Sequence, residues 1–219
     1  MVDSLIIRVY NNAVSTRQAF TRESADNRRE ALIAACGRCL ARYGAHGTSV
    51  RTICVEASVS PGLLRHYFDG IDALIAATYI ATGARVASAL NMAVQAAGDD
   101  PRARLIAFVT ANFSPPIADA DLLATWLAFW SLARSNQAIG KIHDDIYAGN
   151  RRDIERLIAV WPAAPADARL AAVGLTALID GLWLELSLGN APFTADEAEA
   201  LAERWVAALM GSGGEQPAR

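Results

Sequence analysis

The sequence predicts an all-α protein with a small three-helix head at its N-terminus and a larger helical body, about nine helices in total. Apolar residues recur at the spacing of amphipathic helices, and clusters of Gly, Pro and Asp separate the periodic segments. No segment shows the alternating pattern of a half-buried strand. Hydrophobic residues make up 53% of the 219 residues and charged residues 20%, which is typical of a globular chain with a substantial core.

The head is predicted over residues 25–70, and its first helix begins near Ser24. Gly44 supplies a natural C-terminal stop for this helix. The apolar face expected to pack inward consists of Leu32, Ile33, Cys36, Leu40 and Tyr43.

Two short helices joined by a tight turn follow within residues 48–68. Thr48 or Ser49 caps the first of them, and Ser60 caps the second. Pro61 occupies the first position of the second helix, where its missing N–H costs nothing. Two short helices with this spacing form the helix-turn-helix unit, which inserts its second helix into the DNA major groove. The segment therefore predicts DNA binding.

The body is predicted over residues 71–210, between the head and a disordered, Gly-rich tail at residues 211–219. Residues 1–24 are either a flexible basic arm that touches DNA or an extension upstream of the natural start. A long helix from Ile71 to about Ala97 connects the head to the body. Five further helices are expected at residues 101–113, 118–133, 137–160, 165–188 and 194–210.

The charge is distributed unevenly along the chain. The net charge is -3, yet residues 1–70 hold nine Arg against six acidic residues. A basic N-terminal third on an acidic body suits a protein with one DNA-facing end. The three cysteines, an odd number, argue against a secreted disulfide framework, and the sequence shows neither a signal peptide nor 18 consecutive apolar residues. We expect a cytoplasmic protein without a membrane partner.

Parts of the head and of the body resemble a known family. The pattern in the head consists of Thr48-Ser49-Val50, Ile53, Ala57, Val59-Ser60, Gly62 and His66-Tyr67-Phe68. The segments in the body are Asn112-Phe113, Ala124 to Ser131 and Ala177 to Leu184. The head resembles the TetR family of bacterial transcriptional regulators, and the body is similar to its branch around the choline-responsive repressor BetI.

The resemblance implies which head residues meet DNA. Those that would face the groove are Ser60, Gly62, Leu63, Arg65, His66 and Tyr67. Thr48, Ser49 and Arg51 on the preceding helix would contact the DNA backbone. Arginine and tyrosine suit phosphate contacts, and arginine also suits guanine. The alternative is an ordinary helical hairpin packed on a core.

The head departs from the family pattern in two places. Family heads usually carry Gly in the turn where this chain has Ser58, and a residue with a Cβ atom is strained there if its φ is positive. The family also often has a Lys near the start of the fourth helix, whereas this chain reads Asp69-Gly70-Ile71-Asp72. Either DNA binding is weaker than is usual in the family, or Arg51, Arg65 and the N-terminal arm compensate.

A group of aromatic residues and one acid in the body predicts a site for a small-molecule effector. The candidate residues are Trp126, Phe129, Trp130, Tyr147, Asp180 and Trp183. Aromatic faces around a carboxylate can hold a quaternary ammonium cation, because ring quadrupoles attract a cation that forms no hydrogen bonds. The BetI resemblance points to choline or a similar cation. The alternatives are that the aromatic stripe packs a core and that Asp180 pairs with an arginine.

Three other classes of function have less support. A thiol-redox-responsive DNA binder would use Cys36, Cys39 or Cys54, but reactive thiols usually lie at helix N-termini. A zinc site would need two ligands beyond Cys36 and Cys39, and His46 is the one nearby candidate. An enzyme or binding protein that reuses the fold also remains open, although no nucleophile motif or phosphate-binding loop occurs. We expect no cofactor, no metal and no catalytic residue.

The last two predicted helices carry more apolar side chains than one exposed face can hide. The surplus consists of Ala171, Ala172, Gly174, Leu175, Leu178, Leu182 and Trp205. The resemblance implies a homodimer through these two helices, while internal packing of a monomer is the alternative. Two-fold symmetric heads would match a palindromic operator. The predicted function is that of a repressor which a small-molecule effector releases from such an operator.

Overall fold

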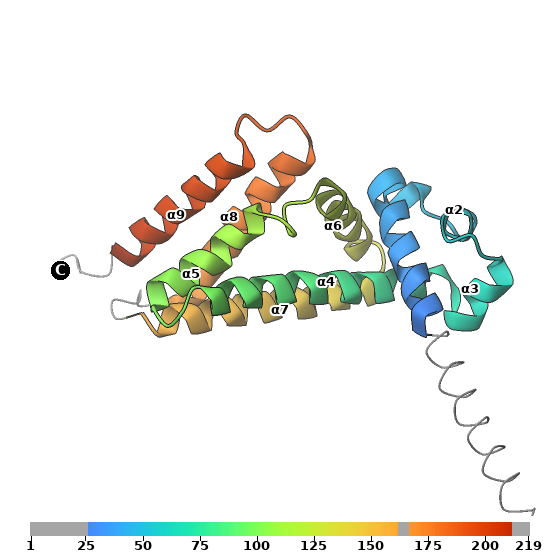
Figure 1. Cartoon of the computed structure of the whole chain (residues 1–219), viewed down its shortest axis with the longest axis horizontal. Helices are drawn as coiled ribbons and strands as arrows, with labels where there is room; N and C mark the ends of the chain where they lie inside the picture. Colours follow the sequence, from blue (N-terminus) through green and yellow to red (C-terminus); the bar gives the residue numbers. More distant parts are fainter. Residues whose placement is uncertain (1–25, 162–166, 212–219) are drawn as a thin grey trace, which may run out of the picture.

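The computed structural model describes residues 26–161 and 167–211, which form nine α-helices and one short 3-10 helix. Figure 1 shows a head at one end of the molecule and a body that contains the remaining helices. The long helix α4 (Gly70–Ala96) starts at the head and runs along the body. No strand occurs in the described residues, so the predicted all-α fold is confirmed. The predicted arm and the tail from residue 212 lie outside these ranges.

The head consists of a helix over residues 26–47, α2 (Val50–Glu56) and α3 (Pro61–Tyr67). Ser49 starts α2 with a capping box, in which its side chain accepts from the Thr52 backbone N–H and the Thr52 hydroxyl accepts from the Ser49 N–H. These two bonds satisfy backbone donors that a short helix otherwise leaves exposed. The local sequence therefore sets the position at which α2 begins.

The core of the head continues into the body without a break. Phe68 at the end of α3 is buried, and it leads to Leu74 and Ile75 in α4. The guanidinium of Arg29 lies 5.0 Å from the centre of the Phe68 ring and covers its outer face. The side chains that fill the head itself are Leu32, Ala35, Cys36, Cys39, Leu40, Ile53, Cys54 and Leu64.

Two turns in the head have left-handed backbone. Gly44 has φ 65°, but it lies within the first helix, which ends at residue 47, later than predicted. Tyr43, predicted for the buried face, is instead 47% exposed, because this last turn extends past the core. Ser58 has φ 54° and is the one non-Gly residue with positive φ in the described part of the chain. The strain expected at this turn is therefore present.

The body helices begin where the sequence supplies capping side chains. Asp100, Asp119, Asn136 and Asp167 each accept a hydrogen bond from the backbone of the helix that follows. These helices are α5 (Pro101–Thr110), α6 (Ala120–Ala133), α7 (Gln137–Ala159) and α8 (Ala168–Ser187), and the last is α9 (Ala195–Gly211). The predicted helix 101–113 ends as a 3-10 turn, η1 (Ala111–Phe113), because the Asn112 side chain donates to two carbonyls of α5.

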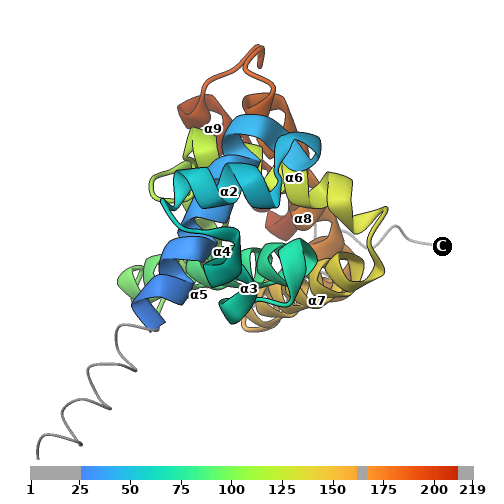
Figure 2. The same ribbon diagram turned by 90° about the vertical axis from the view of Figure 1, so that its right-hand side faces the viewer.

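The body helices pack as a bundle around α4 and α7, which lie side by side, while α6 lies next to the head (Figures 1 and 2). By length and composition alone, α4 and α8 would be long and apolar enough to cross a membrane. Both helices supply core residues, such as Tyr79 and Leu175, and core helices of soluble proteins often have the same composition. This property is weak support for a membrane span.

Candidate functional site

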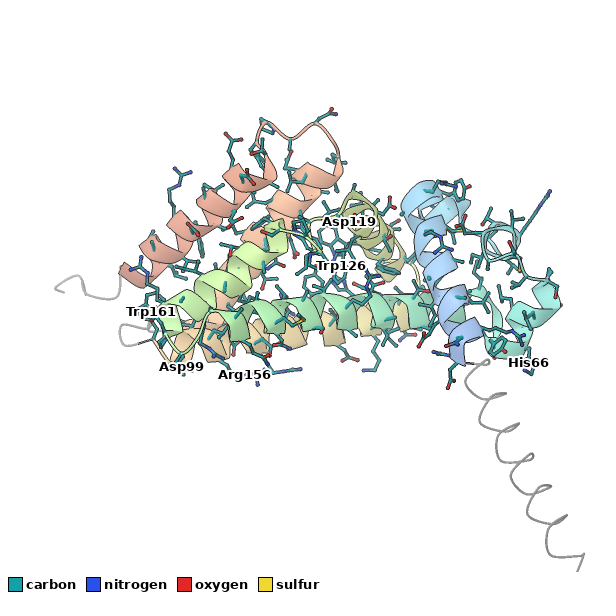
Figure 3. All side chains as sticks on the ribbon, in the orientation of Figure 1. His66, Asp99, Asp119, Trp126, Arg156 and Trp161 are labelled. Atoms are coloured by element: carbon teal, nitrogen blue, oxygen red, sulfur yellow. The ribbon has the colours of Figure 1, made fainter. Side chains whose placement is uncertain are left out.

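α3 presents most of its surface to solvent. The Ser60 hydroxyl caps the helix by accepting from the Leu63 N–H at 3.2 Å, and Leu64 is the one buried side chain. Gly62, Arg65 and His66 are exposed, while Leu63 and Tyr67 are half-buried. The rings of His66 and Tyr67 meet edge to face at 5.0 Å. His66 lies at the outer end of the molecule in Figure 3, and α3 faces the viewer in Figure 2.

The predicted backbone-contact residues before and within α2 differ in exposure. Ser49 and Arg51 are exposed, so their side chains reach solvent at the start of α2. Thr48 is buried, and its hydroxyl donates to the Gly44 carbonyl at 2.7 Å. Thr48 therefore holds the turn between two helices, and the structure does not place its hydroxyl on the exposed surface.

The charges around this surface favour an anionic partner on one side only. Within the described residues, neither Arg51 nor Arg65 forms an ion pair, so both guanidinium groups keep their donors for a ligand. At the start of α4, however, Asp69 and Asp72 stand where a cation would help to bind phosphate. The unpaired guanidinium groups of this surface therefore lie on α2 and α3, while the start of α4 carries acidic side chains.

The body encloses a cavity of about 300 Å³ between α4, α5, α6, α7 and α8. Its aromatic wall includes Trp126 and Trp183, whose rings meet edge to face at 5.7 Å. Figure 3 shows Trp126 in the interior of the body, far from His66. Its lining includes Phe108, Asn112, Trp126, Tyr147, Asp180 and Trp183.

The Tyr147 hydroxyl is the centre of a hydrogen-bond network on the cavity wall. It accepts from the indole N–H groups of Trp126 at 3.3 Å and Trp130 at 2.9 Å, and it donates to Asp180 Oδ1 at 3.0 Å. Burial raises the pKa of Tyr147, and the nearby Asp180 charge adds to this, so the hydroxyl stays protonated. The partner that a buried acid requires is therefore Tyr147.

Asp180 is a carboxylate with a perturbed acidity. Burial raises its pKa to about 6, although the hydrogen bond from Tyr147 and the charge of Arg151 act in the opposite direction. Arg151 stays outside the cavity lining, with its guanidinium 5.9 Å from the Tyr147 ring centre. A cation bound beside Asp180 would lower this pKa again, because it favours the ionised carboxylate. By the same coupling, the ionised carboxylate favours binding of the cation.

The charged residues that line the cavity are all acidic. Asp145, Asp153 and Asp180 contribute carboxylates, and no Lys, Arg or His is among the lining residues in the described part of the chain. Lys141 and Arg156 pair with Asp145 and Asp153 from outside the lining. An aromatic cavity with acidic groups suits a small organic cation and disfavours an anion.

The six predicted effector residues fall into two groups. Trp126, Tyr147, Asp180 and Trp183 line the cavity together. Phe129 is fully buried, where its ring stacks on Tyr79 at 4.1 Å, so it supports the wall from behind. Trp130 lines a neighbouring surface pocket on the other side of Tyr147 and Asp180.

Sequence reasoning missed several lining residues. Phe108 and Asn112 come from α5 and η1, and the Asn112 carbonyl accepts from the Trp183 indole at 3.0 Å. Tyr79, behind the wall, lies 2.9 Å from His143 Nδ1. Because burial lowers the pKa of His143 and raises that of Tyr79, the phenol donates to a neutral imidazole. A polar side chain inside an apolar helix, such as Asn112, was the one signal available in the sequence.

The cysteines and possible metal ligands show no reactive arrangement. Cys36, Cys39 and Cys54 are free and buried, and burial raises the pKa of each thiol, to about 11 for Cys36. Such thiols are poor nucleophiles at neutral pH. In the described residues, no three His, Cys, Asp or Glu side chains are grouped so that they could hold a metal ion.

α8 and α9 carry a set of exposed apolar side chains, here called the α8–α9 apolar face. It consists of Leu170, Val173, Ala177, Gly181, Leu184, Leu188, Leu201 and Trp205. The large members are between 36% and 59% exposed. Four residues assigned to the surplus from the sequence are instead buried against the chain's own body, because the opposite side of α8 packs inward: Ala171, Ala172, Leu175 and Leu182.

Two family models match the chain. The model for bacterial regulatory proteins of the tetR family matches residues 32–78, which contain the helix-turn-helix segment. The model for the C-terminal part of BetI-type transcriptional repressors matches residues 101–211, which contain most of the body.

Relatives and solved structures agree with these matches. The HTH-type transcriptional regulator BetI of Burkholderia thailandensis is 38% identical over 187 residues, which is 84% of this chain and 93% of the relative. BetI of Burkholderia ambifaria is 36% identical over 84% of this chain and 95% of the relative. A putative transcriptional regulator from Pseudomonas aeruginosa PAO1 superimposes with a TM-score of 0.78 at 42% identity, covering 85% and 92% of the two chains.

A more distant structure is that of a putative transcriptional regulator from Saccharomonospora viridis, solved in complex with choline. It superimposes with a TM-score of 0.72 at 22% identity, covering 83% of this chain and 96% of the other. At this identity the likeness is one of fold.

Proposed function

The chain belongs to the TetR family of bacterial transcriptional regulators, in its BetI-type branch, and from this membership we propose a specific mode of action. The protein is a homodimeric repressor that binds a palindromic operator through α2 and α3. A small organic cation in the body cavity releases it from the operator. This function contains no catalytic step. The observation that carries it is the aromatic cavity with acidic groups in a chain whose head displays a helix-turn-helix surface.

The exposed side of α3 supports the proposed DNA contacts. Arg65 and His66 are exposed in its last turn, and Tyr67 in the same turn is half-buried and carries a hydroxyl donor. Half or more of protein–DNA hydrogen bonds reach phosphate or sugar, so such donors contribute affinity at every sequence. Replacing Tyr67 by Ala should therefore weaken operator binding broadly.

The DNA proposal is tested on the promoter region beside the protein's own gene. By fluorescence anisotropy, Tyr67→Ala should weaken operator binding about tenfold. Tyr67→Phe should lose only the affinity that the hydrogen bond of the hydroxyl contributes. Size-exclusion chromatography with light scattering should give the wild-type mass for both variants. Full-strength binding by Tyr67→Ala would contradict this contact surface.

The cavity supports a cationic effector with a bulky apolar head group. Tyr147, Trp126 and Trp183 supply aromatic surface, and Asp180 supplies a carboxylate of raised pKa beside it. The S. viridis structure shows a protein of this fold with choline, which is a quaternary ammonium ligand. We therefore propose choline or a related cation as the effector of this chain.

The matched probes for this site are choline and 3,3-dimethylbutan-1-ol, a neutral molecule of the same shape. Titration of the intrinsic tryptophan fluorescence at pH 8 should saturate with choline. Asp180→Asn removes the charge but retains an oxygen that can accept from Tyr147, so choline affinity should fall about tenfold and that of the neutral probe should stay the same. An equal loss for both probes would mean that Asp180 has a packing role only.

The α8–α9 apolar face supports a dimer. The small residues Ala177 and Gly181 lie between the larger Val173 and Leu184, so a partner helix could approach closely. Contiguous exposed apolar surface of this kind marks interaction sites on most proteins. A second copy of the chain, related by two-fold symmetry, would cover this face and would set the spacing of the two heads.

Release from DNA requires that the effector prefers one conformation. If the cation binds more tightly to the arrangement whose heads do not fit the operator, operator affinity falls by the same factor as that preference. Coupling energies of this kind are typically about 1–3 kcal/mol, or about 5- to 150-fold in affinity. With this preference, binding of the cation relieves repression.

A further inference from the structure

α6 contacts both functional regions through adjacent residues. Trp126 lines the effector cavity, and Thr125, one position earlier, is buried against the head. The Thr125 hydroxyl lies 3.2 Å from the Gly37 carbonyl of the first helix and 2.7 Å from the Asp121 carbonyl of its own helix. One side of α6 therefore meets the ligand site while the other side meets the DNA-binding unit, and Figure 1 shows α6 beside the head.

The Thr125 hydroxyl has one proton and two carbonyl acceptors. A hydroxyl donates one hydrogen bond at full strength, so the proton favours either the head or its own helix according to their separation. The Gly37 carbonyl lies inside a helix and has a backbone partner as well. Neither carbonyl is therefore left without a donor when the hydroxyl changes partner, so the exchange removes one neutral hydrogen bond from the head contact without the larger cost of an unsatisfied buried group.

The contact between α6 and the head lies at the edge of a crevice. The crevice of about 490 Å³ is bordered by the first helix, α4 and α6, and Thr125 and Gly37 both line it. Within the described residues, α6 forms no other hydrogen bond or ion pair with the head. Asp121 of α6 also attracts Arg42 of the first helix at longer range. After Tyr43 and Glu56, its charge contributes to the raised pKa of Arg42.

We propose that Thr125 is a coupling residue which transmits occupancy of the effector cavity to the head. A ligand against Trp126 shifts α6, and the shift changes whether the Thr125 hydroxyl donates to Gly37 or to Asp121. The Thr125–Gly37 hydrogen bond then contributes to the free-energy difference between the head orientations with and without effector. This inference rests on the proposed function, because it needs an effector and an operator.

The test compares Thr125→Val, Thr125→Ser and a control, Thr176→Val. Valine keeps the volume of threonine and removes the hydroxyl, while serine retains the hydroxyl. Thr176 in α8 is equally buried, and its hydroxyl donates to the Ala172 carbonyl four residues earlier, away from the head. For each protein, operator affinity is measured with and without saturating choline, and choline affinity is measured without DNA.

Thr125→Val should reduce the choline-induced change in operator affinity about fivefold, the value of one neutral hydrogen bond. Thr125→Ser should keep most of the wild-type change, and Thr176→Val should keep all of it. A merely structural threonine would alter the melting temperature and leave this ratio intact, so an unchanged ratio in Thr125→Val overturns the inference. A wild-type protein that does not respond to choline would instead contradict the proposed function, which keeps the two failures distinct.

Discussion

The head and the body present their functional side chains in opposite ways. On α3 one side chain is buried, and Arg65 and His66 project into solvent. In the body, Trp126 and Trp183 are buried and meet each other in the interior. Local caps shape the surface of the head, whereas packing among five helices shapes the cavity.

This difference determines which substitutions are informative. An exposed side chain of the head can be removed with little effect on the fold, so its variants report on binding. A wall residue of the cavity contributes to stability and to binding together, because its removal leaves a void and unpaired donors. Informative changes in the body must therefore keep the shape of the side chain, as Asp180→Asn and Thr125→Val do.

The largest expected effect comes from a substitution in the body that weakens DNA binding by the head. Leu184→Glu places a charge on the α8–α9 apolar face, far from α3, and should convert a dimer into monomers of 23.3 kDa. Operator affinity should fall at least about 100-fold, because two heads that are no longer joined bind independently. Light scattering gives the mass, and anisotropy gives the affinity.

The control for Leu184→Glu is Ile80→Glu, which changes an exposed apolar residue of α4 outside that face. It should keep the dimer and the wild-type operator affinity. A dimer that survives Leu184→Glu would show that another surface joins the two copies.

A change of pH should act on the effector site through Asp180. With a pKa of about 6, Asp180 is mostly protonated at pH 5 and mostly ionised at pH 7.5, and a bound cation favours the ionised form. Choline affinity should therefore rise about tenfold between these pH values. Fluorescence titration at each pH measures it, and Asp180→Asn should show a flat profile. The same rise in that variant would assign the effect to other groups, such as Asp145 or Asp153 in the lining.

A charge removed from the head should act on DNA alone. Arg51→Ala should weaken operator binding about fivefold at low salt and reduce the slope of log affinity against log salt by about 0.9, the value of one phosphate contact. Choline affinity should not change. Arg102→Ala removes the same charge from an exposed position of α5 and serves as the control. An unchanged salt slope in Arg51→Ala would mean that this guanidinium stays away from phosphate.

The smallest effect concerns the strained turn of the head. Ser58→Gly removes a Cβ atom at φ 54° and should stabilise the protein by about 1 kcal/mol, with effector binding unchanged. Ser131→Gly, at an exposed position within α6, should instead destabilise it by about 0.5 kcal/mol. Urea denaturation measures both changes, and a loss of stability in Ser58→Gly would contradict the strain.

The head could be predicted from the sequence almost element by element, because its signals act over a few residues. Ser49, Ser60 and Pro61 each mark a helix start within one turn, and the structure uses all three. The prediction that Tyr43 is buried was wrong, because the periodicity of apolar residues does not show where the core that covers them ends. Most ends of the body helices were also close to prediction, because clusters of Gly, Pro and Asp mark them, although the capping roles of Asp100 and Asp119 were not predicted.

The cavity could be predicted only in part, because it is assembled from distant segments. Trp126 and Asp180 are unusual in their helices and could be picked out, but Phe108 is an ordinary helix residue whose place depends on how α5 packs. Phe129 shares a helix with Trp126, yet the stacking on Tyr79 turns it away from the ligand space. Periodicity likewise showed that α8 is apolar all round, but not which side packs inward.

The saturation of the Tyr147 hydroxyl has a consequence for discrimination among amines. Two indoles already donate to this oxygen, and its own proton is held by Asp180. A primary ammonium arrives with three donors that it must withdraw from water, and at this hydroxyl it finds no free lone pair. A quaternary ammonium has no such donors and gives up no hydrogen bonds to water when it enters. The hydroxyl therefore offers a primary ammonium no hydrogen bond, so at this wall the donors of such a ligand could turn only to a carboxylate such as Asp180.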